Sequence, residues 1–137
     1  MNSAAQSPLI SLQNISKHFG EGDMRVDALK SVSLDISPRQ VVGLLGPSGS
    51  GKSTLLNVIG CIVNPSEGKM VLDGDVINDG QHQHGDLRSL RLSKIGFIFQ
   101  AHNLIPFLSS AENIAVVLQI AGLDAEKANA ECSIPDA

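Results

Sequence analysis

The sequence contains no tryptophan and no tyrosine, and only four phenylalanines among its 137 residues. Aromatic rings on which unpaired bases could stack are therefore scarce. The ten basic residues are scattered along a chain whose formal net charge is −4. Proteins that bind nucleic acids do so largely through basic surfaces, so we expect no nucleic-acid partner.

Cysteine and long apolar runs are also lacking. The two cysteines, Cys61 and Cys132, show no metal or redox spacing, which fits a reducing cytoplasm. The longest apolar run, residues 114–118, is broken by Gln119 and is far shorter than the roughly 20 residues of a membrane span. The N-terminus has no basic head followed by an apolar stretch, so export is not indicated.

The sequence does contain a glycine-rich loop, which reads Gly-Pro-Ser-Gly-Ser-Gly-Lys-Ser-Thr at residues 46–54. The apolar run 41–45 before it predicts a strand. Helical periodicity follows it, at Leu55, Val58, Ile59 and Ile62. A strand, a G-x-x-x-x-G-K-[ST] loop and an amphipathic helix are together typical of a phosphate-binding P-loop. We therefore expect the ligand to be a nucleotide polyphosphate with Mg²⁺.

The residue types of this loop suit a polyphosphate. Its glycines let the backbone bend and turn its N–H groups inward. Lys52 is expected to reach the β- and γ-phosphates. The Ser53 hydroxyl is the expected Mg²⁺ ligand, and Thr54 is expected to donate to the α-phosphate. The predicted nucleotide-binding residues of the loop are Gly46, Pro47, Ser48, Gly49, Ser50, Gly51, Lys52, Ser53 and Thr54.

Alternation and turn signals predict the other elements. Strands are expected at 9–15, 26–36, 69–72 and 95–100, with a turn at 17–23 and a hairpin turn at Asp73-Gly74. Helices are expected after the capping residues Asp86, Ser109 and Asp124. Strands before the P-loop and helices after it predict an α/β fold with an antiparallel β portion.

Three further features distinguish among P-loop proteins. Phe19 lies 33 residues before Lys52, Gln100 lies 48 residues after it, and residues 65–74 read PSEGKMVLDG. With these the chain resembles the nucleotide-binding subunit of ATP-binding-cassette (ABC) transporters over residues 10–129. Residues 46–56, 97–100 and 103–106 are most similar to the lipoprotein-release and macrolide-export branch, whereas residues 130–137 diverge from the family.

The resemblance implies a fold and a set of functional residues. It implies that residues 1–137 form the N-terminal part of an ABC nucleotide-binding domain, with an antiparallel β portion, a P-loop core and the start of a helical subdomain. Phe19 would be the aromatic ring that stacks on adenine; the alternative is a core phenylalanine between two strands. Gln100 would complete the Mg²⁺ shell and bind the attacking water; the alternative is a polar residue that merely ends a strand. Residues 101–108 would contact a membrane permease.

Several residues imitate functional motifs. Met70-Val71-Leu72-Asp73 looks like a Walker B strand, but Gly74 follows where a catalytic glutamate is needed. His82 and His84 fit a solvated loop better than a metal site. The acidic residues Asp124, Glu126 and Glu131 are expected on a solvated helix face.

The hydrolytic groups that the family supplies from later residues are not found: the L-S-G-G-Q signature, the Walker B Asp-Glu pair and the switch histidine. Of the catalytic set, only Lys52 and Gln100 are recognised. We therefore expect a truncated chain that binds ATP and Mg²⁺ without efficient hydrolysis. We also expect it to be marginally stable, because the strand before the P-loop lacks a neighbour.

The expected function is that of an ATP-binding subunit that works as a head-to-tail dimer with a second such subunit. It would be cytoplasmic and peripheral on the inner face of the cell membrane, where it drives export or lipoprotein release through a permease. One alternative is a nucleotide-binding remnant without a transport role. Another is a different P-loop enzyme such as a small-molecule kinase, although no arginine-rich lid follows Gln100.

Overall fold

The computed structural model describes residues 7–80, 85–101 and 103–132. The chain forms two compact units, residues 1–95 and 96–137. The histidines 82 and 84, which the sequence assigns to a solvated loop, lie outside the described residues.

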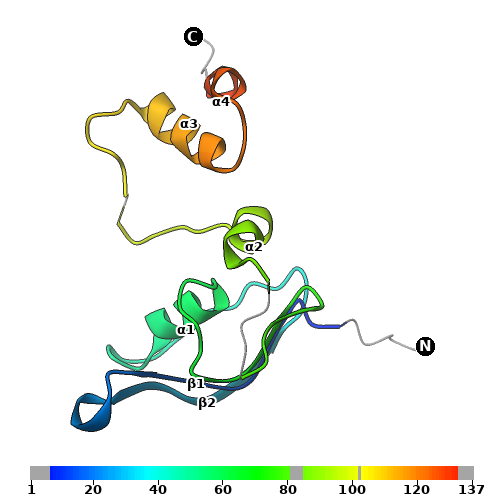
Figure 1. The fold of residues 1–137 in the computed structure, drawn as a ribbon, viewed down its shortest axis with the longest axis vertical. Coiled ribbons are helices and arrows are strands. Elements are labelled where there is room, and N and C mark those ends of the chain that lie inside the picture. Colours follow the sequence, from blue (N-terminus) through cyan, green and yellow to red (C-terminus); the bar gives the residue numbers. More distant parts are fainter. Residues whose placement is uncertain (1–6, 81–84, 102, 133–137) are drawn as a thin grey trace. The chain divides into compact units, whose positions relative to one another are not determined.

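The first unit is built on a four-stranded antiparallel sheet (Figure 1). Its strands are β1 (Ile10–Phe19), β2 (Val26–Ile36), β3 (Glu67–Leu72) and β4 (Asp75–Asn78), in the spatial order β2-β1-β3-β4. Strand β1 is longer than predicted, because it keeps pairing with β2 as far as Phe19 opposite Val26. The predicted turn at 17–23 is therefore wrong over its first half, and the chain reverses instead through a short 3-10 helix at Gly22–Met24.

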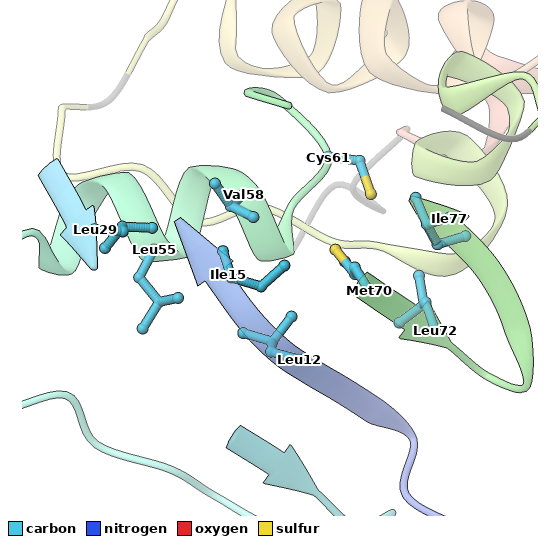
Figure 2. Close-up of a cluster of buried hydrophobic side chains, with 9 residues drawn as sticks. All are labelled: Leu12, Ile15, Leu29, Leu55, Val58, Cys61, Met70, Leu72 and Ile77. Carbon is cyan, nitrogen blue, oxygen red and sulfur yellow. The ribbon is translucent and has the colours of Figure 1, made fainter. Parts of the chain in front are cut away.

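The core of this unit lies between the sheet and helix α1 (Lys52–Ile59) (Figure 2). Leu55 and Val58 of α1 face the sheet, where Leu12 and Ile15 of β1 are almost completely buried. Each fully buried aliphatic side chain contributes about 1.5–3 kcal/mol, so this contact anchors α1. The helix is shorter than its periodicity predicts, and Ile62 lies beyond its end. The remaining buried members of the cluster are Leu29, Cys61, Met70, Leu72 and Ile77.

The predicted hairpin at Asp73-Gly74 is confirmed, because both residues have positive φ, 51° and 85°, as a two-residue turn of this type requires. The Asp73 carboxylate pairs with Lys94 of helix α2 (Leu87–Lys94), whose N-terminus is capped by Asp86. Asp73 is thus a turn residue with a cationic partner, which agrees with its rejection as a Walker B aspartate.

Two predicted strands, 41–45 and 95–100, are wrong, because neither segment has regular structure. A strand needs a neighbour for its N–H and C=O groups, and within the described ranges no strand pairs with either segment. Val41 and Leu45 are consequently exposed.

The second unit contains helices α3 (Ser110–Ile120) and α4 (Ala125–Glu131). The predicted capping box is present: the Glu112 carboxylate accepts from the Ser109 N–H, and the Ser109 hydroxyl accepts from the Glu112 N–H. Asp124 caps α4 as predicted. Ala115, Ala128 and Cys132 form a small buried cluster between the helices. In the described part of the chain, no helix is both long enough and apolar enough to cross a membrane.

Candidate nucleotide-binding site

The glycine loop leads directly into helix α1. Gly51 precedes the helix with a φ of 87°, and its carbonyl accepts the first helical hydrogen bond, from the Leu55 N–H at 2.8 Å. The N–H groups of Lys52, Ser53 and Thr54 therefore have no acceptor within the helix. Such a helix N-terminus attracts anions through its free donors and its dipole.

A cavity of about 580 Å³ lies between this loop and strand β2. This volume is within the usual range for small-molecule sites. Seven consecutive P-loop residues and the start of β2 line it: Ser48, Gly49, Ser50, Gly51, Lys52, Ser53 and Thr54 with Val26, Asp27 and Ala28. The predicted residues Gly46 and Pro47 instead line a neighbouring cavity of about 300 Å³, on the side of Leu44 and Leu55.

The loop approaches β2 so closely that only glycine fits at position 51. A Cβ atom on Gly51 would lie 2.5 Å from the carbonyl oxygen of Ala28 and 3.1 Å from the Leu29 side chain. Gly49 also has a positive φ, 80°, but a Cβ there would meet nothing within 4 Å. The two glycines are thus required for different reasons, close packing at 51 and backbone conformation at 49.

The Lys52 ammonium folds back over the loop. It donates to the carbonyl oxygens of Gly46 at 2.9 Å and Pro47 at 2.6 Å, and more weakly to the Ser50 hydroxyl at 3.3 Å. Among the described residues, no carboxylate forms an ion pair with it. Its positive charge is therefore available to an anion in the loop, which would compete with neutral carbonyls and not with an acidic side chain.

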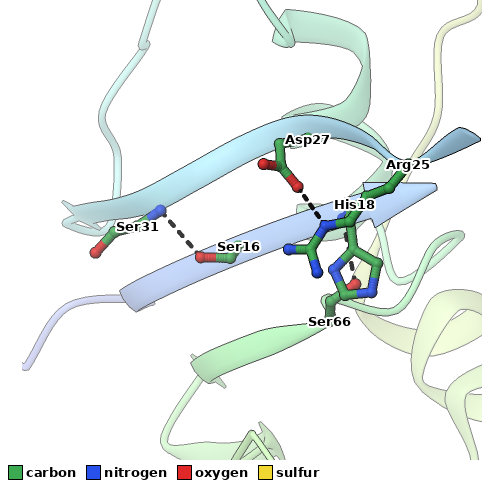
Figure 3. Close-up of polar contacts among 6 residues, drawn as sticks. All are labelled: Ser16, His18, Arg25, Asp27, Ser31 and Ser66. Carbon is green, nitrogen blue, oxygen red and sulfur yellow. Dashed lines mark hydrogen bonds and ion pairs between the residues drawn. The ribbon is translucent and has the colours of Figure 1, made fainter. Parts of the chain in front are cut away.

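The one carboxylate in the described cavity wall, Asp27, is already paired. The Arg25 guanidinium donates to it at 2.8 Å (Figure 3). This hydrogen bond holds the pKa of the Asp27 carboxyl below its ordinary value. Arg25 thereby offsets the repulsion that a bare carboxylate would exert on a phosphate group.

The residues present fit Mg²⁺ only if the ion binds together with a polyphosphate. Ser53, on the first turn of α1, offers a hydroxyl oxygen in the cavity wall. Across the described ranges, no three His, Cys, Asp or Glu residues are placed to hold a metal. Mg²⁺ commonly takes few protein ligands and fills its shell with phosphate oxygens and water, which suits a single serine.

Phe19 lies beside the cavity and not in the core. It ends β1 directly opposite Val26, a cavity residue, and 46% of its surface is exposed. The alternative of a core phenylalanine is therefore wrong. The Lys17 ammonium lies 5.0 Å from the centroid of the Phe19 ring.

Gln100 belongs to the second unit, in an exposed stretch without regular structure. Its predicted part in the Mg²⁺ shell stays a prediction.

The segment predicted to meet a permease borders an apolar groove in the second unit. Within the segment 101–108, Leu104 and Phe107 are exposed. A groove of about 560 Å³ is lined by this segment and one face of α3: Leu104, Ile105, Pro106, Leu108, Ser110, Asn113, Ile114, Val117 and Leu118.

Asn113 is a residue that the sequence interpretation missed. Its side chain accepts from the Ile105 N–H at 2.7 Å and donates to the carbonyls of Ile105, Leu108 and Ser109 at 3.0–3.3 Å. It therefore fixes the loop before α3. The available signal was an amide side chain directly before the apolar residues Ile114 to Leu118.

Together, the glycine loop, the free helix N-terminus and the adjoining cavity define a P-loop nucleotide-binding protein. A family model described as "ABC transporter" matches residues 29–136. The chain therefore belongs to the ABC transporter family, as the resemblance implies.

Relatives in the family agree with this assignment. The chain is 44% identical over 110 residues to an uncharacterized ABC transporter ATP-binding protein, MJ0796, of Methanocaldococcus jannaschii, covering 80% of this chain and 46% of that one. It is 43% identical over 129 residues to the macrolide export ATP-binding/permease protein MacB 1 of Aeromonas hydrophila, covering 92% of this chain and 19% of that one. The expected similarity to the macrolide-export branch is thus confirmed.

Solved structures confirm the fold class. A dimeric, post-hydrolysis structure of the cassette MJ0796 bound to ADP and Pi superimposes with a TM-score of 0.77 at 37% identity. That match covers 90% of this chain and 53% of the other. A second dimeric MJ0796 structure gives a TM-score of 0.75 at 39% identity, covering 88% and 53%. The chain spans about half the length of these structures and less of the curated relatives.

Proposed function

We propose that this chain holds Mg²⁺ and ATP for an ABC transporter. The observation that carries the proposal is the cavity between the P-loop and β2. Its wall holds the Lys52 ammonium, which no described carboxylate pairs, and an exposed aromatic ring lies beside it. The ADP and Pi named for the related cassette support this ligand class.

In this proposal, the free N–H groups at the start of α1 bind phosphate oxygens. Lys52 exchanges the Gly46 and Pro47 carbonyls for the β- and γ-phosphates. Thr54 donates to the α-phosphate, and Phe19 stacks on adenine, which favours ATP by the shape of its base. When bound, Mg²⁺ neutralises phosphate charge, with Ser53 as a ligand and Gln100 as a further one.

The wider assembly is also a proposal. Residues 101–108 contact a membrane permease on the cytoplasmic side of the cell membrane, and a second ATP-binding subunit joins head to tail. The relatives named ATP-binding/permease proteins and the dimeric cassettes support these partners. The pump would power export or lipoprotein release.

We further propose that this chain alone turns over ATP slowly or not at all. Attack of water on the γ-phosphate needs a group that orients the water. The 137 residues carry no recognisable signature, Walker B pair or switch histidine. Phosphate release by the purified chain well above background would contradict slow turnover.

Titration calorimetry with Mg-ATP tests the central claim. Lys52→Ala removes the ammonium from the loop and should weaken ATP binding by at least about tenfold, the order expected for charge-assisted hydrogen bonds. Lys30→Met is the matched control, because Lys30 is an exposed lysine of the neighbouring strand that does not line the P-loop cavity. Unchanged ATP affinity in a folded Lys52→Ala protein would refute the proposed function.

A further inference from the structure

In the described part of the chain, the Lys17 ammonium contacts the face of the Phe19 ring. Its Nζ atom lies 5.0 Å from the ring centroid, within the distance at which a cation is attracted to an aromatic face. Among the described residues, no hydrogen bond or ion pair involves this ammonium. Among those residues, the Phe19 ring is thus the sole partner of the Lys17 ammonium.

The backbone that carries these two side chains is fixed. Lys17 is paired with Leu29 and Phe19 with Val26 across the β1–β2 ladder. Between them, the His18 N–H donates to the Ser66 hydroxyl at 3.2 Å (Figure 3). Phe19, by contrast, stands at the end of a strand, and nearly half of the residue's surface is exposed. Its orientation is therefore set by few contacts, of which the ammonium is one.

We infer that Lys17 is a positioning residue for the nucleobase: its ammonium holds one face of the Phe19 ring and leaves the other face for adenine. An aromatic ring carries partial negative charge on both faces. A cation on one face draws electron density toward itself, which lowers the repulsion felt by a base that stacks on the other. The inference rests on the proposed function, since it requires that Phe19 stacks on the base of ATP.

The affinity contributed by the base can be measured apart from that contributed by the phosphates. Inorganic triphosphate can use the P-loop but has no base, so its affinity should not depend on Lys17. ATP uses both. An exposed cation–π contact accounts for an affinity change of about two- to fivefold, which calorimetric titration resolves.

The test compares the dissociation constants of Mg-ATP and of inorganic triphosphate at fixed ionic strength. Lys17→Met removes the charge but keeps an apolar side chain, and it should weaken ATP by about two- to fivefold while triphosphate is unchanged. Lys17→Arg keeps a cation over the ring and should restore ATP affinity. Lys30→Met removes an equal charge from the adjacent strand and should change neither ligand. In a Phe19→Ala background, Lys17→Met should have no further effect.

Other results overturn the inference. Equal losses for ATP and triphosphate would mean that Lys17 acts as a distant charge on the phosphates. Unchanged or tighter ATP binding by Lys17→Met would mean that the ammonium does not orient the ring, or that it covers the face used by the base. If Phe19→Ala also leaves ATP affinity unchanged, the proposed stacking of adenine on Phe19 is wrong as well. If Phe19→Ala weakens ATP binding and Lys17→Met does not, the stacking stands and only the role of Lys17 is refuted.

Discussion

The contrast between two glycines of the P-loop gives a sharp test of how the loop is held. Gly49→Ala and Gly51→Ala both place a Cβ on a backbone with φ near 80–90°. A non-glycine residue in this region costs about 1–2 kcal/mol. At Gly49 the new Cβ enters open space, so the free energy of unfolding should fall by that amount alone.

Gly51→Ala should cost more, because its Cβ would lie 2.5 Å from the Ala28 carbonyl oxygen. That atom belongs to the backbone of β2, which pairs with β1 and cannot move freely. Forcing extra atoms into a packed site costs about 1–3 kcal/mol. With a urea dependence of about 2 kcal/mol per molar, the unfolding midpoint of Gly51→Ala should lie about 0.5–1.5 M below that of Gly49→Ala.

Circular dichroism is the suitable probe, since the chain has no tryptophan or tyrosine whose fluorescence could report unfolding. Both variants share the cost of a non-glycine residue at positive φ, so that cost cancels between them. The difference between the two urea midpoints therefore measures the close approach of the loop to β2. Equal midpoints for the two variants would show that the loop does not pack against β2 as described.

Three further predictions concern other parts of the molecule. Asn113→Ala leaves the Ile105 N–H without its side-chain acceptor and should lower protection of that amide in hydrogen exchange by about 1–3 kcal/mol; unaltered exchange would show that Asn113 does not fix the loop. Hydrogen bonds from Ser109, chiefly from its hydroxyl, lower the pKa of Glu112 below 4.5. The contribution of Glu112 to the start of α3 is therefore complete above pH 4.5 and is lost as the pH falls through the lower folded pKa. Protection of the amides in this turn, taken relative to the intrinsic exchange rate at each pH, should fall on acidification, whereas Glu112→Gln should abolish that fall, and a variant that kept it would exclude the capping box as the cause. Val41→Lys should reduce light scattering on storage without shifting the urea midpoint, because Val41 is exposed within an unpaired apolar run; a lowered midpoint would mean that Val41 is packed.

The elements that could be predicted from the sequence are those whose determinants are local. The Asp73-Gly74 hairpin depends on two residues that tolerate positive φ, and the caps at Asp86, Ser109 and Asp124 depend on side chains that bond to their own helix. The segments 41–45 and 95–100 were wrongly predicted as strands. Their apolar residues favour a strand, but a strand also needs a pairing partner, and no described strand supplies one.

In the candidate site, too, the features set by local sequence were predicted and those set by distant residues were not. The motif located the P-loop, but it could not show that Arg25 neutralises Asp27 in the cavity wall or that Lys17 covers the Phe19 ring. Both depend on where β1 and β2 place residues that are remote from Lys52 in the sequence. Asn113 was missed because its partners are main-chain groups of a loop, which no side-chain pattern specifies.

The P-loop is held in place without its own strand. The segment before the loop, residues 41–45, has no regular structure, yet the loop is anchored at its other end. There Gly51 packs against β2, and Leu55 and Val58 bury α1 against the sheet. Burial of those two side chains is worth about 3–6 kcal/mol together, at 1.5–3 kcal/mol each. That is enough to fix the N-terminus of α1, which carries the free donors. Phosphate binding should therefore depend more on these contacts than on the order of residues 41–45.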